Sequence, residues 1–150
     1  MRLWHYKLIP VLPDKMLVAQ WRECIAIERQ WKKGTLKHKL VNYVKNYDGE
    51  LFINYCYALI REMEHRDIKW NCKYIQEIGY FCQNKEEKIP DGIYYPEHNN
   101  RYLTQCYFNL QEKHDRGIVT EEEWNKIKKS NLLELERKGK RKWKKKLKSF

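Results

Sequence analysis

Hydrophobic positions recur every three or four residues along most of this chain. The clearest stripe follows Asp48, a good helix N-cap, and consists of Leu51, Phe52, Tyr55, Cys56, Leu59, Ile60 and Met63. This spacing places all of these side chains on one face of an α-helix. We therefore predict that residues 51–63 form the central helix of the hydrophobic core.

Weaker stripes of the same period predict helices on both sides of this segment. One runs from Asp14, a candidate N-cap, to about Trp31. A short helix through residues 35–44 is expected to follow it. Residues 68–82 predict a further helix or helical turn on the other side of the central helix.

The last third of the chain predicts two more helices. The first covers about residues 97–113, and a capping box at residues 120–123 starts the second. Residues 88–96 form a turn-rich loop around Pro-Asp-Gly, and residues 1–12 read as extended or irregular. Convincing strand alternation is absent. The predicted fold is therefore all-α, a compact single-domain helical bundle with irregular loops and an extended N-terminal segment.

The chain is long enough for one domain with a real core. We expect a helical domain over residues 1–136 and a basic, aromatic tail over 137–150, either part of that domain or flexible. Cations around an aromatic ring favour contact with phosphates and bases, although a solvated tail is the alternative. The candidate contacts in the tail are Lys142, Trp143, Lys144 and Lys145.

Composition points to a polyanionic partner. The net charge is +11 and the isoelectric point is about 9.4, which favours nucleic acid over simple solubility. Trp4, His5 and Lys7 interrupt any early apolar run, so we expect no signal peptide, and no apolar run suggests a membrane span. The five cysteines form no CxxC pair, so we expect no metal site and a reduced cytoplasmic location.

Two short features could carry chemistry. The first is the N-terminus, where the Met1 α-amine precedes Arg2, because an ordinary α-amine titrates close enough to neutrality to be partly uncharged and nucleophilic. The second is the pair Arg22-Glu23 on the first predicted helix. An ordinary flexible terminus and a common surface ion pair are the alternatives. Glu97-His98 is the one local acid–histidine pair near a loop, so we include His98 among the candidate DNA contacts.

Three segments together resemble a known family. They are LVAQWRE at 17–23, the apolar helix at 51–63 that ends near His65-Arg66, and Tyr95-Pro96-Glu97-His98. In order and spacing they are similar to the small phage endonuclease V family of pyrimidine-dimer DNA glycosylases and AP lyases. The resemblance covers most of the chain through short motifs.

The resemblance implies a specific chemistry. In that family an N-terminal α-amine attacks the sugar C1′ of the damaged nucleotide, and a glutamate serves the resulting imine and the β-elimination that cuts the strand. Here the matching residues are Met1 and Glu23, with Arg2 and Arg22 as phosphate contacts. The family also has a further arginine shortly after the essential glutamate. In this chain Ala26 stands at that position, and Arg29, one turn on, is the candidate substitute.

The start of the chain departs from the family pattern. The family exposes a threonine after removal of the initiator methionine, whereas Arg2 disfavours that removal here. If this chain is aligned to the family without a gap, Arg2 replaces the threonine and the nucleophile is lost or altered. If this chain instead has one extra residue somewhere in 4–12, Met1 supplies the amine and Arg2 keeps its phosphate role. We favour this second alignment. A histidine that the family carries near residue 16 is also absent.

The resulting hypothesis is a monomeric DNA-repair or modified-base glycosylase with AP-lyase activity. Its partner would be double-stranded DNA that is damaged, abasic or modified, and it would need no cofactor. A non-catalytic helical DNA-binding protein of the same fold is the first alternative, and a helical interaction protein with incidental charge is the second. The choice of lesion stays open.

Overall fold

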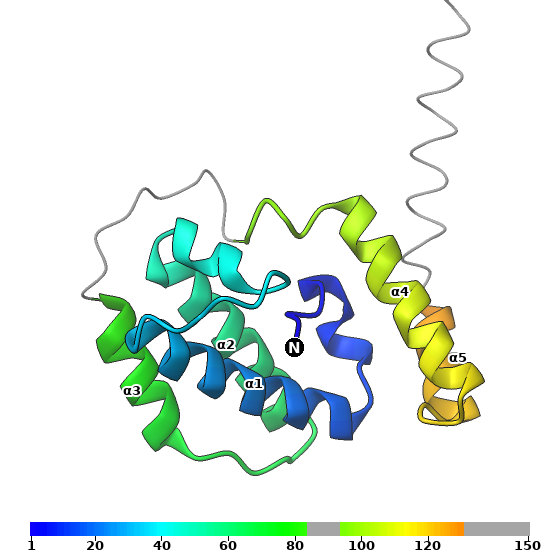
Figure 1. Ribbon diagram of the computed structural model, residues 1–150. Coiled ribbons are helices and arrows are strands. Elements are labelled where there is room, and N and C mark those ends of the chain that lie inside the picture. The colour runs from blue at the N-terminus through cyan, green and yellow to red at the C-terminus, as the bar shows by residue number, and fades with distance from the viewer. Residues whose placement is uncertain (84–93, 131–150) are drawn as a thin grey trace, which may run out of the picture. The chain divides into compact units, whose positions relative to one another are not determined.

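The all-α class is confirmed, and the α-helices lie in the segments where the apolar stripes predict them. Residues 6–11, which we expected to be extended or irregular, instead form a 3-10 helix. A computed structural model describes residues 1–83 and 94–130. The chain divides into two compact units, Met1–His98 and Asn99–Phe150. The helices of the first unit, in chain order, are the 3-10 helix η1 (Tyr6–Val11), α1 (Asp14–Lys32), the 3-10 helix η2 (Asn42–Asn46), α2 (Gly49–His65) and α3 (Cys72–Gln83) (Figure 1).

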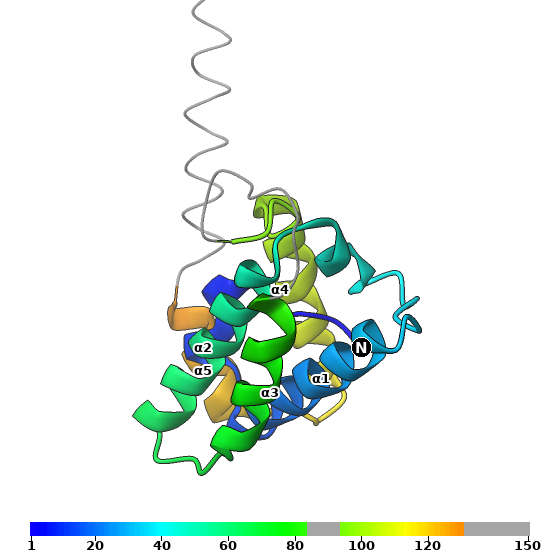
Figure 2. The ribbon, with the colours of Figure 1, turned by 90° about the vertical axis from the view of Figure 1, so that its left-hand side faces the viewer.

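Helix α2 is the centre of the first unit, as predicted. It packs against α1, α3, η1 and η2, and α1 also contacts α3 (Figure 2). The whole predicted stripe from Leu51 to Met63 is buried. Because burial of each large apolar side chain contributes about 1.5–3 kcal/mol, this one face accounts for much of the unit's stability.

The start of α1 differs from the prediction by one residue. Pro13 is the N-cap, and Asp14 is the first helical residue instead of the cap. The Asp14 carboxylate accepts a hydrogen bond from Arg66 Nη1 at 2.9 Å, and the same nitrogen donates to the Leu12 carbonyl at 2.6 Å. Arg66 Nη2 adds a bond to the Pro10 carbonyl at 3.1 Å. The end of α2 thereby fixes the chain between η1 and α1.

Two other predicted helices are shorter than expected. Within residues 35–44 only η2 forms, and it is a 3-10 helix that begins at Asn42. Helix α3 begins at Cys72, four residues later than predicted. Its end lies close against the start of α2, because a Cβ atom added to Gly49 would meet the Cys82 Cβ and carbonyl oxygen at 2.7 Å. Glycine at this position allows the two helices to approach.

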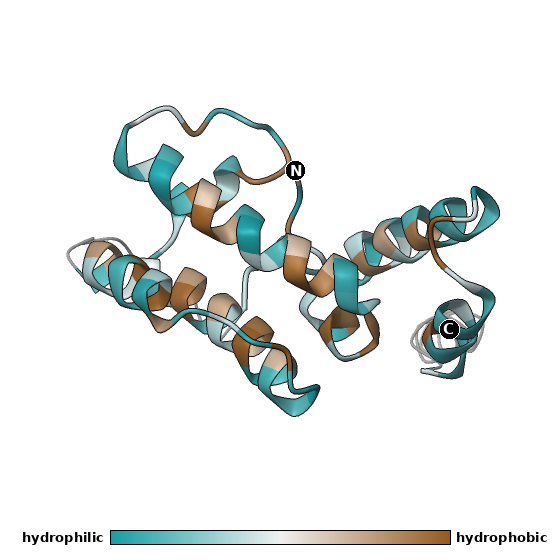
Figure 3. Ribbon diagram, turned by 90° about the horizontal axis from the view of Figure 1, so that it is seen from below, coloured by the Kyte–Doolittle hydropathy of each residue, from teal (hydrophilic) through white to brown (hydrophobic). Residues whose placement is uncertain are grey.

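The second unit contains α4 (Asn100–Asp115) and α5 (Glu121–Lys129). The Asn99 side chain caps α4 by accepting from the Tyr102 N–H at 2.9 Å. The predicted capping box of α5 is confirmed, since Thr120 and Glu123 exchange side-chain-to-backbone bonds of 3.2 and 3.0 Å. Both helices are amphipathic, because α4 buries Leu103, Cys106 and Leu110 and α5 buries Trp124 and Ile127. Figure 3 shows hydrophobic and hydrophilic residues mixed along the helices.

The cysteines, the Pro-Asp-Gly turn and the start of the basic tail were also predicted from the sequence. Cys24, Cys56 and Cys106 are buried core residues, as predicted. The Pro-Asp-Gly turn and the predicted boundary between residues 136 and 137 lie outside the described residues, so both stay predictions. Across residues 1–83 and 94–130, none of the helices combines the length and the apolar character needed to span a membrane.

Candidate functional site

The N-terminal segment is held against α1 by one buried amide side chain. Gln20, which is 1% exposed, accepts the Trp4 N–H on Oε1 at 2.7 Å and donates from Nε2 to the Arg2 carbonyl at 2.9 Å. The Tyr55 hydroxyl donates to the Trp4 carbonyl at 2.7 Å. Residues 2–4 are therefore fixed by α1 and α2, and the N-terminus lies beside α1 in Figure 1 and Figure 2.

The same amide reaches the predicted catalytic carboxylate. Gln20 Nε2 also donates to Glu23 Oε2 at 3.1 Å. One side-chain nitrogen thus joins the Arg2 carbonyl to the Glu23 carboxylate, and Met1 is one residue away from that point. Met1 is 37% exposed, and the Arg2 guanidinium lies 5.6 Å from the Trp4 ring centroid. The structure therefore brings Met1, Arg2 and Glu23 into one region.

Two histidines hold the other end of the N-terminal segment. His5 Nδ1 accepts the Lys7 N–H at 3.2 Å, so a neutral ring carries its proton on Nε2, which donates to the His98 carbonyl at 2.8 Å. His98 Nδ1 accepts the Tyr6 N–H at 3.3 Å, and its Nε2 lies 2.9 Å from the Tyr43 hydroxyl oxygen. These bonds join residues 5–7 to the chain near residue 98.

His98 therefore does not take the position expected of a phosphate contact. Its side chain is buried, and burial together with the neighbouring His5 lowers the pKa of His98 to about 3. The ring is neutral at physiological pH and supplies neither positive charge nor an exposed donor. We reassign His98 from a DNA contact to a residue that holds the N-terminal segment.

Glu97, the other half of that acid–histidine pair, also turns inward. Its Oε1 accepts a hydrogen bond from the Tyr47 hydroxyl at 2.7 Å. Burial and this carboxylate raise the pKa of Tyr47 to about 12. The Glu97-His98 motif is thus part of the packing between residues 94–98 and the rest of the first unit.

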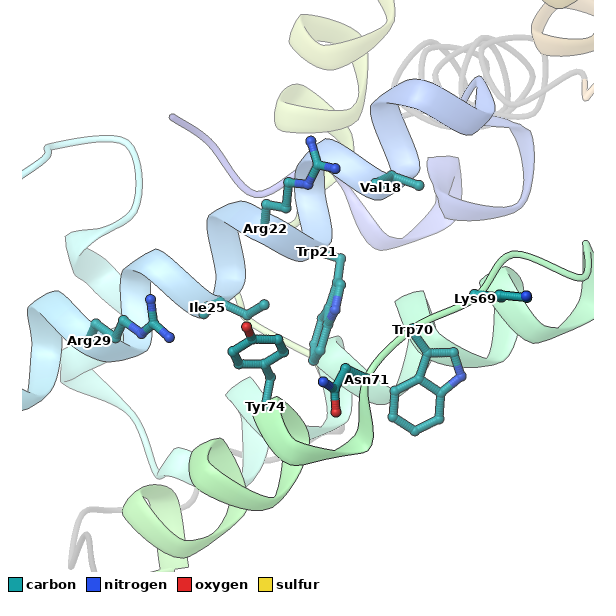
Figure 4. Close-up of a pocket in the computed structure, with 9 residues that line it drawn as sticks. All are labelled: Val18, Trp21, Arg22, Ile25, Arg29, Lys69, Trp70, Asn71 and Tyr74. Carbon is teal, nitrogen blue, oxygen red and sulfur yellow. The ribbon is translucent and has the colours of Figure 1, made fainter.

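A cleft of about 400 Å³ opens on a neighbouring face of α1 (Figure 4). Trp21, which is 5% exposed, lies at its base, and Arg22 and Arg29 line it two turns apart on α1. The segment before α3 and the first turn of α3 close the other side. The complete lining is Val18, Trp21, Arg22, Ile25, Arg29, Lys69, Trp70, Asn71 and Tyr74.

The charge and chemistry of this cleft suit nucleic acid. Three of its lining side chains are cations and none is a carboxylate, so its field attracts phosphates. The Arg29 guanidinium lies 5.7 Å from the Tyr74 ring centroid, in the range of a cation–π contact. Adjacent residues on a helix point about 100° apart, so Arg22 lines the cleft while Glu23 reaches the N-terminal segment.

Sequence reasoning missed the residues that assemble this region. Gln20 falls in the apolar phase of α1, between Leu17 and Cys24, and a polar residue on a buried stripe must find partners. That signal was present in the sequence. The partners themselves, Trp4 and Tyr55, are far from Gln20 along the chain, and no local pattern reveals them.

The remaining predicted contacts belong to the basic tail. Lys142, Trp143, Lys144 and Lys145 lie outside the described residues. Within the parts of the chain that the structure describes, there is no group of three or more His, Cys, Asp or Glu side chains that could hold a metal ion.

Comparison with known proteins adds one match. The family model for pyrimidine dimer DNA glycosylases matches residues 1–76, which include the N-terminal segment, α1, α2 and both walls of the cleft. Neither a curated protein nor a solved structure matches the chain.

Proposed function

Because the chain belongs to the pyrimidine dimer DNA glycosylase family, we propose that it is a DNA-repair glycosylase that also cleaves the strand as an AP lyase. The Met1 α-amine is the proposed nucleophile and Glu23 the proposed catalytic carboxylate. The substrate class is double-stranded DNA that carries a damaged, abasic or modified nucleotide.

The proposed reaction has two stages. The uncharged amine attacks C1′, the N-glycosidic bond breaks, and the base leaves with the bonding electrons and takes up a proton. The nitrogen lone pair then forms the C1′=N bond as the C1′–O4′ bond breaks, O4′ takes up a proton, and the resulting ring-opened imine makes the C2′ protons acidic. Glu23 removes one of them, the C3′–O bond breaks, and the 3′ phosphate leaves. Water then hydrolyses the imine, which restores the amine and releases an unsaturated aldehyde on the cut strand.

The observation that carries this proposal is the link through Gln20. The distance from the Arg2 carbonyl to the Glu23 carboxylate cannot exceed the sum of two hydrogen bonds, 2.9 and 3.1 Å. The residue that bears the amine directly precedes Arg2. A nucleophile on the residue before Arg2 and a proton acceptor beside the Arg2 carbonyl are suited to act on adjacent carbons of one sugar, C1′ and C2′.

Proposed DNA contacts surround this point. Arg22 and Arg29 line one cleft, which supports Arg29 as the substitute for the arginine that Ala26 replaces. Arg2 would bind phosphate beside the amine. Glycosylases must take the target nucleotide out of the stack, and phosphate contacts on both sides of the lesion would hold the distorted duplex during that step.

Strand cleavage by a Glu23→Gln variant tests the proposal. Without a carboxylate to remove the C2′ proton, we expect cleavage of an abasic-site duplex to fall by at least about 100-fold while DNA binding stays within about threefold. Glu64→Gln, a change on the exposed side of α2, is the matched control and should cleave like the wild type. Equal cleavage by Glu23→Gln and the wild type would exclude the proposed role of Glu23.

A further inference from the structure

We propose that Gln20 is a positioning residue for the chemical step, because it sets the amine and the Glu23 carboxylate in one fixed arrangement. This inference rests on the proposed function and extends it to a residue that does not touch the substrate. It assigns a role to a buried polar group that the reaction itself does not use.

The orientation of the Gln20 amide is fixed by its partners. The Trp4 N–H can only donate, so the atom 2.7 Å from it must be the amide oxygen. The Arg2 carbonyl can only accept, so the atom 2.9 Å from it must be the amide nitrogen. The second proton of that nitrogen then points to Glu23 Oε2. In a flipped amide, the amide nitrogen would face the Trp4 N–H, which is also a donor, and the amide oxygen would face the Arg2 carbonyl, which is also an acceptor.

These bonds fix the N-terminal segment in a single register. In an extended chain the carbonyl of one residue and the N–H of the residue two places later point to the same side. Gln20 binds Arg2 and Trp4 in this way, as a residue of a neighbouring strand would. The Tyr55 hydroxyl supports the amide from α2, since it lies 3.1 Å from Gln20 Oε1. Only Met1 extends beyond this clamp.

The second bond of Nε2 holds the carboxylate. Glu23 lies three residues after Gln20, so both side chains emerge from adjacent turns of α1. The bond at 3.1 Å limits the rotamers that Glu23 can adopt. The amine and the carboxylate are therefore positioned by the same nitrogen, and loss of that nitrogen releases both groups at once.

Two variants separate this role from simple support of the fold. Gln20→Glu keeps the size of the side chain and the acceptor for Trp4, but it loses the donor to Arg2 and Glu23. Gln20→Met keeps only the approximate size. The matched control is Glu28→Gln, which changes a buried polar residue of α1 that lies eight residues after Gln20.

The measurement is single-turnover cleavage of an abasic-site duplex at saturating protein, alongside the dissociation constant for the same duplex. We expect both Gln20 variants to lower the rate constant by about 100-fold, with dissociation constants within about threefold of the wild type. Hydrogen exchange of the Trp4 amide should accelerate in Gln20→Met. Glu28→Gln should retain the wild-type rate.

A purely structural role predicts a different pattern. Partial unfolding would lower the fraction of protein that reacts, but the folded fraction would react at the wild-type rate constant. That result, or an unchanged rate constant in well-folded Gln20→Glu, would overturn the inference. If the wild type itself fails to cleave, the proposed function fails first, so the two failures are distinguishable.

Discussion

His5 and His98 are 93 residues apart in the chain, yet His5 Nε2 donates to the His98 carbonyl at 2.8 Å in the first unit. Their ring centroids are 5.4 Å apart. The backbone of residues 5–7 is therefore fixed from one side by the segment near His98, and residues 2–4 are fixed from the other side by Gln20. The proposed nucleophile at Met1 extends from a segment that is held at both places.

The low pKa of His98 predicts that acid weakens this arrangement. The folded protein keeps the ring neutral down to about pH 3, whereas an unfolded chain protonates it near its ordinary pKa of 6.5. The unfolded state thus binds more protons between these values, so the stability contributed by neutral His98 is present above about pH 6.5 and is lost as the pH falls toward 3. Free energies of unfolding measured across this range should decline by up to about 1.4 kcal/mol per pH unit from this group.

A variant isolates the contribution of His98 from that of the carboxylates. His98→Gln should flatten the decline between pH 6.5 and 4, whereas His65→Gln at an exposed position should leave it unchanged. The same pH dependence in His98→Gln and the wild type would show that His98 is not the group responsible.

Glu28 predicts a pH effect of the opposite sign. Burial, followed by the nearby Glu77 carboxylate, raises the pKa of Glu28, although Lys32 and Arg29 oppose the shift. Folding therefore favours the protonated carboxyl, and stability is lost as the pH rises from about 4.5 through the folded-state pKa. Glu28→Gln removes this cost, so we expect a higher Tm at pH 7 than in the wild type.

Thermal unfolding at two pH values checks this. The gain from Glu28→Gln should shrink at pH 4, where the wild-type carboxyl is protonated. Glu77→Gln, which removes only the neighbouring charge, should give a smaller gain. A lower Tm for Glu28→Gln at pH 7 would mean that the ionised carboxylate stabilises the fold.

Arg22 and Arg29 are predicted to bind DNA phosphates. Each phosphate contact contributes about 0.9 to the slope of log binding constant against log salt concentration. Arg22→Gln and Arg29→Gln should each weaken DNA binding and reduce the magnitude of that slope by about 0.9, the contribution of one phosphate contact. Arg61→Gln, at an exposed position on α2 that is not in the cleft lining, removes the same charge and is the matched control. Equal slopes in all three variants would exclude specific contacts in the cleft.

The basic tail makes a separate prediction. Truncation after Glu136 should weaken DNA binding and flatten its salt dependence, because the Lys and Arg side chains that it removes no longer displace counterions from the DNA. Salt titrations of DNA binding measure this directly. Trp143→Ala within the full chain separates the aromatic contribution, since it should weaken binding without changing the salt slope. An unaltered salt slope after truncation would show that the tail does not contact phosphate.

The sequence predicts the helices of this protein better than its site. The stripe around Tyr55 and the capping box at Thr120 are local patterns, and both appear where they were expected. Asp14 is the first helical residue instead of the cap, and its carboxylate pairs with Arg66, which is distant in sequence. Local capping preferences cannot anticipate a partner supplied by another helix.

The site depends on such distant partners throughout. Met1, Arg2 and Glu23 could be chosen from the resemblance, but Gln20 and Tyr55 gain their roles only when the N-terminal segment packs on α1 and α2. His98 was chosen as a contact because it is polar and near a loop. Its bonds to Tyr6 and Tyr43 instead direct it inward, which a single sequence does not reveal.

Borohydride trapping on an abasic-site duplex tests the central claim most directly, with mass spectrometry of the trapped peptide. Reduction converts an imine between protein and sugar into a stable covalent bond. The proposed mechanism predicts one cross-link, at the Met1 α-amine, that forms in the wild type and is lost when that amine is blocked. A cross-link only at an internal lysine, or DNA binding without any cross-link, would contradict the assignment of Met1 as the nucleophile.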